Sequence, residues 1–559
     1  MSGFLCMHRA KCLNLFLNVC FLFLISCLTT HIYSSNNSEF INQFKGSIST
    51  MNLYQILDTD IGCTGLHKYY DDTQAKCSYV KSHSGCQPIG YISYLQLFFC
   101  TFDPPLGLTL LILWLILLFY LLADTAAKYF CSSLEGLSII LKLSPTIAGV
   151  TLLSLGNGAP DLFASMVSFT GDGTKYVGLN SILGGAFFVS STVVGITSIT
   201  VCNHGRSIDK SSFIRDVLFF LLSLSCLVLI IFLEKINLWG ALCFLSLYFI
   251  YVFLVSISQI CGNRDKEGVA TDGSSILPVT GGLSELGAPL LGNTKCFNLK
   301  SSTSGFFGSV LYILELPLCL PRRLTIPDIS EERWSKPFAV VSVTVSPVLL
   351  AFLWNSYGTK PSFLVYAIGG LIGIIFGVLA IFTTERSDPP RKWLLPWLVG
   401  GFLMSITWTY ILAEELVSLL VSLGLILGIS PSILGLTVLA WGNSLGDLVA
   451  NVTMAKTGGP DGARVAISGC YAGPIFNTLV GLGLPLVFSS WAAYPSCYVI
   501  PTDTFVYETL GFLMVGLLWA LVILPKRNMR LDRFLGFGLL AIYLCFLCLK
   551  MARGQQLLA

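Results

Sequence analysis

The chain has 559 residues, of which 54% are hydrophobic and only 11% are charged. Soluble domains carry about 25% charged residues, so this composition, with a mean hydropathy of +0.76, excludes a soluble globular fold and indicates many membrane-spanning helices. The formal net charge of +3 is small and spread between apolar segments, so it gives no indication of nucleic-acid binding.

The N-terminal region combines a targeting segment with a polar segment. His8, Arg9 and Lys11 precede an apolar run, and this pattern in residues 1–28 predicts a secretory signal peptide or an uncleaved anchor. Residues 29–104 then form a luminal or extracellular segment, because the signal would carry them across the membrane.

The polar segment has the features of an oxidising compartment. Asn36-Asn37-Ser38 matches the acceptor pattern for N-glycosylation, with Asn36 as the candidate residue. Three cysteines lie between Thr29 and about Gly90, namely Cys63, Cys77 and Cys86, and Cys100 follows. One of the first three stays unpaired unless Cys100 joins them, so the disulfide pairing stays open.

Twelve apolar stretches are long enough to cross a bilayer, for which about 20 residues are needed. They are predicted at residues 106–127, 138–168, 176–201, 215–232, 236–258, 337–354, 362–383, 393–420, 430–455, 463–488, 505–524 and 533–550. If the N-terminal segment lies outside, most lysines and arginines between the spans lie on the inner side, as the positive-inside rule requires.

The spans form two blocks of five with a connection between them. The first block covers residues 105–258, and a cytoplasmic loop of residues 259–336 follows, either as a regulatory segment or as a linker. Two linking transmembrane helices occupy residues 337–392, and the second block covers residues 393–559. The apolar stretch from Phe306 to Leu320 is interpreted as lying on the membrane surface.

One apolar stretch occurs in both blocks. Residues 144–164 and 430–450 align without a gap and agree at eleven positions, from an initial Ser-Pro to a final Ala. The first copy carries Gly-Asn-Gly-Ala-Pro-Asp and the second Gly-Asn-Ser-Leu-Gly-Asp, sequences that weaken a helix in its middle. The expected breaks lie at Gly156, Gly158, Pro160, Gly442 and Gly446, where backbone carbonyls would turn toward a site.

The two copies are predicted to cross the membrane in opposite directions. The first runs from inside to outside and the second from outside to inside, given the twelve spans above. The predicted fold is therefore an all-α polytopic membrane protein with two inverted-topology repeats of five transmembrane helices and broken helices at a central ion site.

Asp161 and Asp447 are the central residues of the predicted site. A carboxylate at the bilayer centre costs several kcal/mol unless it faces a partner or a water-filled cavity, so it marks an ion pathway. A hard cation between two carboxylates removes their repulsion, and calcium takes 6–8 oxygen ligands. Asn157 and Asn443 lie one helical turn before the acids, and Ser444 adds a hydroxyl.

Other polar residues on these helices are secondary candidates. Thr151 and Thr437 lie earlier in the two motifs, and each either contributes an oxygen or bonds back to its own helix, which is the favoured interpretation. Four acids near the membrane ends are interpreted as interface residues: Asp124, Glu135, Glu414 and Glu415.

The two motifs, read on to Ser165 and Asn451, resemble those of the cation/calcium exchanger branch of the sodium/calcium exchanger superfamily. The resemblance is strongest to the plant members, extends to the mitochondrial sodium/lithium/calcium exchanger, and covers residues 105–258 and 393–550. It implies two inverted sets of five helices that exchange ions at a shared central site. It also implies that Asp161 and Asp447 are the central acids and that Asn157, Asn443 and Ser444 are neighbouring ligands.

The resemblance implies a further ligand on the helix that follows each motif. Gly473-Pro474-Ile475-Phe476-Asn477 matches the family pattern, which makes Asn477 the candidate. Val189 stands at the corresponding place of the first copy, and the central acids are aspartates where many members have glutamates. These departures leave the counter-ion and the stoichiometry open.

The prediction is a secondary-active cation antiporter rather than an enzyme. It would exchange Ca²⁺, and/or K⁺ or Na⁺, against Na⁺, K⁺ or H⁺ by alternating access, with inorganic cations and membrane lipids as partners and with no cofactor and no nucleic acid. The alternatives are an H⁺-coupled K⁺/Na⁺ transporter without Ca²⁺ transport, an intramembrane aspartyl protease and a cation channel. The predicted location is the plasma membrane, with the vacuolar or endoplasmic reticulum membrane as alternatives, and the oligomeric state stays open.

Overall fold

The computed structural model describes most of the chain from residue 73 onward. The described residues are 73–83, 90–141, 154–170, 175–202, 207–267, 319–330, 333–356, 363–386, 389–390, 394–457, 459–500 and 504–556, with Cys63, Leu66 and Cys86 as isolated positions. The chain divides into two compact units, Met1–Lys68 and Tyr69–Ala559, and all helices and strands below belong to the second. The predicted signal segment, Asn36 and Thr151 lie outside the described residues.

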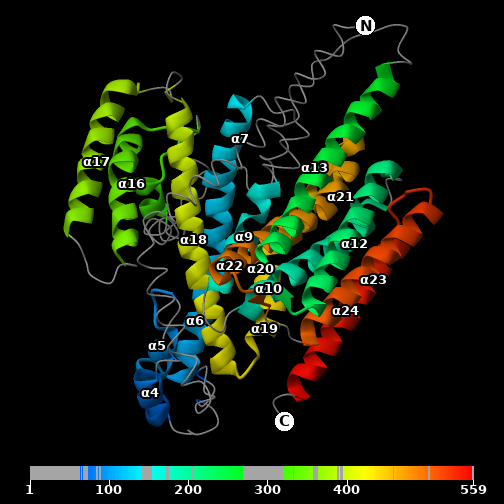
Figure 1. Ribbon diagram of the computed structural model, residues 1–559, viewed down its shortest axis with the longest axis horizontal. Coiled ribbons are helices and arrows are strands. Elements are labelled where there is room, and N and C mark those ends of the chain that lie inside the picture. The colour runs from blue at the N-terminus through cyan, green and yellow to red at the C-terminus, as the bar shows by residue number, and fades with distance from the viewer. Residues whose placement is uncertain are drawn as a thin grey trace, which may run out of the picture. The chain divides into compact units, whose positions relative to one another are not determined.

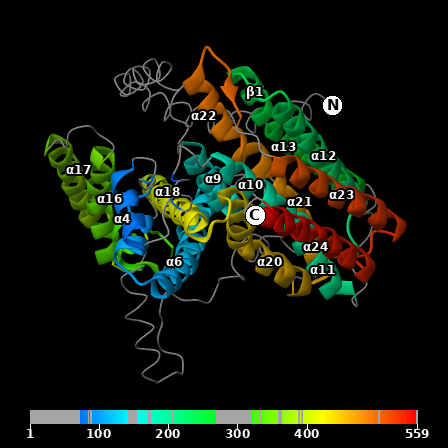
Figure 2. The ribbon, with the colours of Figure 1, turned by 90° about the horizontal axis from the view of Figure 1, so that it is seen from below.

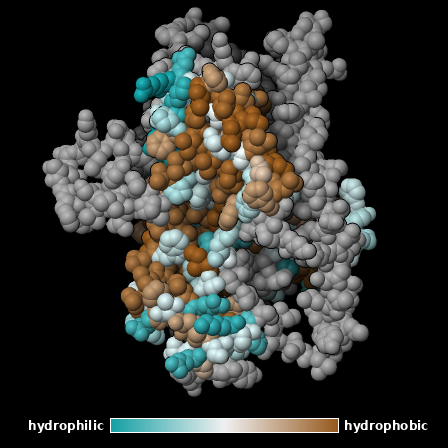
Figure 3. Space-filling view, turned by 90° about the vertical axis from the view of Figure 1, so that its left-hand side faces the viewer, coloured by the Kyte–Doolittle hydropathy of each residue, from teal (hydrophilic) through white to brown (hydrophobic). Residues whose placement is uncertain are grey.

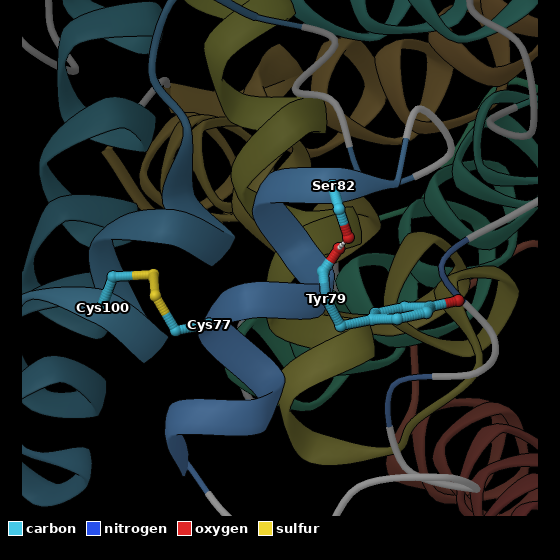
Figure 4. The surroundings of a disulfide bond; sticks show 4 residues. All are labelled: Cys77, Tyr79, Ser82 and Cys100. Carbon is cyan, nitrogen blue, oxygen red and sulfur yellow. Dashed lines mark hydrogen bonds between the residues drawn. A yellow bond between two sulfur atoms is a disulfide. The ribbon is translucent and has the colours of Figure 1, made fainter.

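Two short helices precede the long ones. They are α4 (Thr73–Ser82) and α5 (Tyr94–Cys100), and a disulfide joins Cys77 to Cys100 (Figure 4). Beside it the Ser82 hydroxyl donates to the Tyr79 carbonyl oxygen, 3.1 Å away. Cys100 therefore does join the cysteines of the polar segment, and Cys63 and Cys86 are also disulfide-bonded.

The first half continues with long apolar helices. Its elements are α6 (Pro104–Thr125), η2 (Ala126–Phe130), α7 (Cys131–Ile140), α9 (Ser154–Thr170), α10 (Lys175–Phe187), η4 (Phe188–Val193), α11 (Val194–Val201), α12 (Lys210–Phe232), β1 (Lys235–Ile236) and α13 (Leu238–Glu267). The helix that begins at Pro104 runs on through η2 and α7, so the predicted start of the second span at residue 138 is wrong.

The second half repeats this order after two connecting helices. Its elements are α16 (Lys336–Ser356), α17 (Phe363–Thr383), α18 (Leu394–Leu427), α19 (Pro431–Leu434), η7 (Gly435–Leu439), α20 (Ala440–Thr457), α21 (Gly459–Phe476), η8 (Asn477–Gly481), α22 (Gly483–Ala493), β2 (Tyr498–Val499), α23 (Thr504–Lys526) and α24 (Arg533–Gln556). The segments labelled η are π-helical.

Eleven helices within the described residues are long and apolar enough to cross a membrane. The remaining predicted span, 138–168, corresponds in part to α9, of which 17 residues are described. Figure 3 shows a broad apolar surface on one side of the molecule, with hydrophilic side chains toward its ends. On α17, Phe363 and Phe382 are 84% and 83% exposed, as expected of side chains that face lipid.

Contacts between loops agree with the predicted sidedness. Strand β1 pairs antiparallel with β2, and both lie in loops that the charge pattern places outside. Ser207 forms a bridge with Arg530, and both lie in loops that the pattern places inside. Each contact joins a loop of the first half to a loop of the second half, so the two loops lie on the same side of the membrane. One span too many or too few between the two loops would have placed them on opposite sides.

Helix α9 lies between two apolar clusters. The larger cluster gathers side chains from α10 to α13 and from α20 to α24, and the smaller gathers α5, α6, α9 and α18. Helices α6 and α18 lie side by side (Figures 1 and 2). Residues of both halves therefore meet at α9, which carries the first of the two motifs.

Candidate functional site

Asp161 is held by residues from the other half of the chain. Its side chain is only 4% exposed. Asn443 Nδ2 donates to Asp161 Oδ1 (2.8 Å), and Asn477 Nδ2 donates to Asp161 Oδ2 (2.7 Å). These donors stand 282 and 316 positions away along the chain, so the carboxylate of the first motif is organised by the second half.

Three further oxygens near this carboxylate have nothing to bind. Asn443 Oδ1, Asn477 Oδ1 and Ser444 Oγ are buried and find no hydrogen-bond partner within the described part of the chain. Buried polar atoms are nearly always paired, and unpaired carbonyl and hydroxyl oxygens beside a carboxylate are the ligand types that hard cations prefer. No cluster of three or more His, Cys, Asp or Glu side chains occurs among the described residues, so amide and hydroxyl oxygens dominate this set.

Two glycines let backbone approach the site. A Cβ atom at Gly158 would lie 2.3 Å from Asn477 Oδ1, which is far inside the contact distance. A Cβ atom at Gly185 in α10 would lie 3.3 Å from Ser444 Oγ and 3.7 Å from Asp161 Oδ2. Sequence reasoning missed Gly185 as a site residue, although its place in the segment that matches Gly473 was a usable signal.

Asp447 lies in a different environment. Its side chain is half-buried, and no hydrogen bond to its carboxylate occurs among the described residues. The negative charge of Asp161 acts on it. A Cβ atom at the neighbouring Gly446 would meet nothing within 4 Å, so open space adjoins this part of α20.

Asn157 and Thr437 do not join the cluster. Asn157 is exposed, and its side chain has no hydrogen-bond partner in the described residues. The Thr437 hydroxyl donates to the Ile433 carbonyl oxygen (2.7 Å), so it bonds back to its own helix as the favoured interpretation held. The structure thus brings together Asp161, Asn443, Ser444 and Asn477.

The irregular helical turns and the helix proline lie within or next to the repeated motifs. Residues 154–170 and 440–457 are helical, so Gly156, Gly158, Gly442 and Gly446 do not interrupt the helix. Pro160 lacks an N–H, which leaves the Gly156 carbonyl without its helical donor. Of the π-helical turns, η7 lies within the second motif, ahead of Gly442, and η8 begins at Asn477 itself. Such turns occur often at functional sites because they leave carbonyls unpaired.

Two of the acids interpreted as interface residues are buried instead. Asp124 is 1% exposed and forms ion pairs with Lys128 (2.5 Å) and Arg322 (2.8 Å). Glu415 is 6% exposed, and it accepts hydrogen bonds from the Tyr91 backbone N–H and from the Tyr94 hydroxyl (2.5 Å). The interface interpretation is wrong for both, because Arg322 reaches Asp124, and Tyr91 and Tyr94 reach Glu415, from distant segments that the sequence pattern does not connect.

Comparison with known proteins links this arrangement to a transporter family. The family described as "Sodium/calcium exchanger protein" matches residues 111–257 and 397–552. The chain is 54% identical to Cation/calcium exchanger 1 of Arabidopsis thaliana over 97% of each chain. It is 50% identical to Cation/calcium exchanger 2 of that plant, over 96% of each chain.

More distant relatives and solved structures also match. The human mitochondrial sodium/calcium exchanger protein is 32% identical over 85% of this chain and 87% of its own length. The crystal structure of the H⁺/Ca²⁺ exchanger CAX covers 87% of this chain and 89% of its own, at 14% identity and a TM-score of 0.41. A structure of the sodium-calcium exchanger NCX_Mj covers 78% of this chain and 98% of its own, at 14% identity and a TM-score of 0.36.

Proposed function

The chain belongs to the sodium/calcium exchanger protein family, and from this premise we propose that it is a cation/calcium antiporter. The observation that carries the proposal is the Asp161 carboxylate, bound by Asn443 and Asn477 from the other half and ringed by unpaired oxygens. A site shared between two inverted halves is the arrangement that alternating access needs, because one half can move against the other around it.

The proposed binding step replaces amide hydrogens by a cation. In the structure, Asn443 and Asn477 turn their NH₂ groups toward Asp161. Rotation of each amide by half a turn would present its oxygen to a calcium ion held by the carboxylate, with Ser444 as a further ligand. Asp447 would complete the site from α20, since the cation also removes the repulsion between the two acids.

Exchange follows from the charge of the empty site. Two ionised carboxylates in the bilayer centre repel each other and are costly to move, so the carrier would change sides only with a cation or a proton on board. We propose that the counter-ion is Na⁺, K⁺ or H⁺. Potassium or sodium transport driven by protons, without calcium, is the second candidate, because the valine at position 189 leaves fewer oxygens than a site for several ions requires.

The moving parts are proposed to be α6 and α18. The two helices pack on each other, and α6 touches the second motif, since a Cβ atom at Gly442 would lie 2.2 Å from the Phe119 ring. Sliding of α6 would therefore disturb the residue directly before Asn443. Asn157, whose side chain is exposed, would line the access path, and the plasma membrane, with the vacuole or endoplasmic reticulum as alternatives, is the proposed location.

A protease or a channel fits the site less well. An aspartyl protease shares one water between two carboxylates, whereas both oxygens of Asp161 accept amide hydrogens. A channel needs a continuous path, whereas Asp161, Ser444 and Asn477 are all buried. Both comparisons favour a carrier that closes around its ion.

The test is ion flux in proteoliposomes of the purified chain. Vesicles loaded with calcium would face gradients of sodium, potassium or protons, one at a time, beside the variants Asp161→Asn and Asp447→Asn. Calcium efflux that requires one counter-ion and stops in both variants is the expected result. Proton-driven potassium or sodium flux without calcium movement would support the second candidate, and unchanged flux in either variant would refute the site.

A further inference from the structure

Residues 319–330, at the end of the long polar loop, pack into the helical bundle. Residues 319–325 are helical, and Arg322 and Ile326 are each 1% exposed. A burial this complete is rare for arginine unless its charge is paired. The loop therefore ends in a built contact and not, at this point, in a bare linker.

One set of contacts fastens this segment to α6. Arg322 Nη1 donates to Asp124 Oδ2 (2.8 Å) and to Thr125 Oγ1 (3.0 Å), both on α6. Lys128, in the η2 continuation of α6, binds the other oxygen of Asp124 (2.5 Å). Just beyond the segment, Arg333 donates to the Lys128 carbonyl oxygen (2.7 Å). The Asp124 carboxylate thus joins two cations within a buried environment.

A second set of contacts fastens the same segment to α18. Trp408 Nε1 donates to Thr325 Oγ1 (2.7 Å). Gly401 lies so close to the Pro327 carbonyl that a Cβ atom there would be 2.5 Å from its oxygen. An apolar cluster joins η2, the segment and α18 through Tyr129, Ile326 and Met404.

The same two helices are also joined a few turns further along, through α5. Tyr94 of α5 donates to Glu415 of α18, and Trp114 of α6 donates to the Tyr94 hydroxyl (2.9 Å). Helices α6 and α18 are therefore linked at two levels, each time through another segment of the chain, and α6 also reaches the second motif through Phe119 and Gly442. None of these contacts involves Asp161, Asn443, Ser444 or Asn477.

We propose that residues 319–330 are a clip that makes α6 and α18 move as one body, an inference that rests on the proposed alternating-access function. Separating Arg322 from Asp124 would leave an uncompensated buried charge, so the clip stays closed while the pair of helices moves. Arg322 is a positioning residue, because it acts through α6 and touches no ion. Its loss uncouples the helices and slows the change of access, while ion binding persists.

The test compares two adjacent arginines. Arg322→Gln removes the bond to α6, whereas Arg323→Gln removes an equal charge whose guanidinium stacks on Phe338 of α16 (4.1 Å). In proteoliposomes, Arg322→Gln should lower the maximal exchange rate about tenfold, with calcium binding to the purified protein and the apparent KM unchanged. Arg323→Gln should stay within about twofold of wild type. Arg322→Lys should be intermediate, since lysine keeps the charge and loses the planar fork.

Hydrogen–deuterium exchange tests whether the clip couples α6 and α18, and it needs no transport assay. Arg322→Gln should speed amide exchange in η2 and in residues 404–412 of α18 together, and Arg323→Gln should not. Equal effects of the two glutamine variants, loosening of η2 alone, or a loss of calcium binding in parallel with the rate would overturn the clip. If wild-type vesicles exchange no calcium, the proposed function fails, and the deuterium result still decides whether the two helices are coupled.

Discussion

The two copies of the motif place their aspartates in different surroundings. Asp161 is buried, and both of its oxygens accept hydrogen bonds from amides of the other half. Asp447 is half-buried and accepts none from the described residues. Nearly identical local sequences therefore produce unequal acids, because the partners of each acid are supplied by the opposite repeat.

Two substitutions between the repeats account for this difference. Asn477 in the second half corresponds to Val189 in the first, so the amide that binds Asp161 has an apolar counterpart on the side of Asp447. Gly158 corresponds to Ser444, and only the glycine leaves room for Asn477. We infer that a duplicated site can divide its work, with one acid held by hydrogen bonds and the other left to respond to the ion.

The largest expected effects come from replacing the two acids, and the two variants should differ in their free energy of unfolding. Asp161→Asn and Asp447→Asn should both abolish exchange, yet in calcium-free buffer only Asp161→Asn should lower the free energy of unfolding, by about 1–3 kcal/mol. Hydrogen bonds to a charged group contribute that much, and only Asp161 accepts them; either substitution relieves the repulsion between the two acids. Thermal unfolding of the purified variants measures the difference, and equal melting temperatures would contradict the comparison.

Asn477→Val tests the side-chain amide of Asn477, whose counterpart in the first half is Val189. The substitution makes the second half resemble the first and removes one donor and one oxygen, so calcium affinity should fall about tenfold. Calorimetric titration with calcium measures it. The control is Asn180→Val, a buried amide of α10 that bonds to the Tyr176 carbonyl; an equal loss of affinity there would mean that any buried amide gives the effect.

Gly158→Ala tests the close approach. The new methyl group would collide with Asn477 Oδ1 and with the Phe476 ring, so the Asn477 amide must move away from Asp161. The exchange rate should therefore fall several-fold, as is usual when a buried site is overpacked. The matched control is Gly446→Ala in the other motif, where a Cβ atom meets nothing within 4 Å. Wild-type flux in both variants would contradict the claim that the site depends on the close approach of Gly158 to Asn477.

Asp209 provides a reference carboxylate outside the membrane-spanning helices, with the smallest expected effect. It caps α12 by accepting from the Ser212 backbone N–H (2.9 Å). This hydrogen bond, and the nearby charges of Arg464 and Arg215, lower the pKa of Asp209. Asp209→Ala should cost about 1 kcal/mol at pH 7, the usual value of an N-cap.

The sign of the pH dependence follows from the lowered pKa of Asp209. The cap stabilises the folded chain fully above the unfolded-state pKa, near pH 4, and its contribution disappears as the pH falls through the lower folded-state pKa. The gap in melting temperature between wild type and Asp209→Ala should therefore close in acid. A gap that widens below pH 4 would contradict this assignment.

The sequence by itself determined the membrane class, the two blocks of helices, the duplicated motif and four residues that meet in the site: Asp161, Asn443, Ser444 and Asn477. The length of apolar runs, the charges between the spans and the repeated motif can be read from the sequence directly, without any knowledge of contacts between helices. Only the tertiary structure decided that Asp161 takes its partners from the other half, that Asn157 stays outside the cluster, and that Arg322 and Glu415 join distant segments. Those contacts depend on how helices far apart in the chain pack together, and periodicity along one helix carries no information about the residue that faces it.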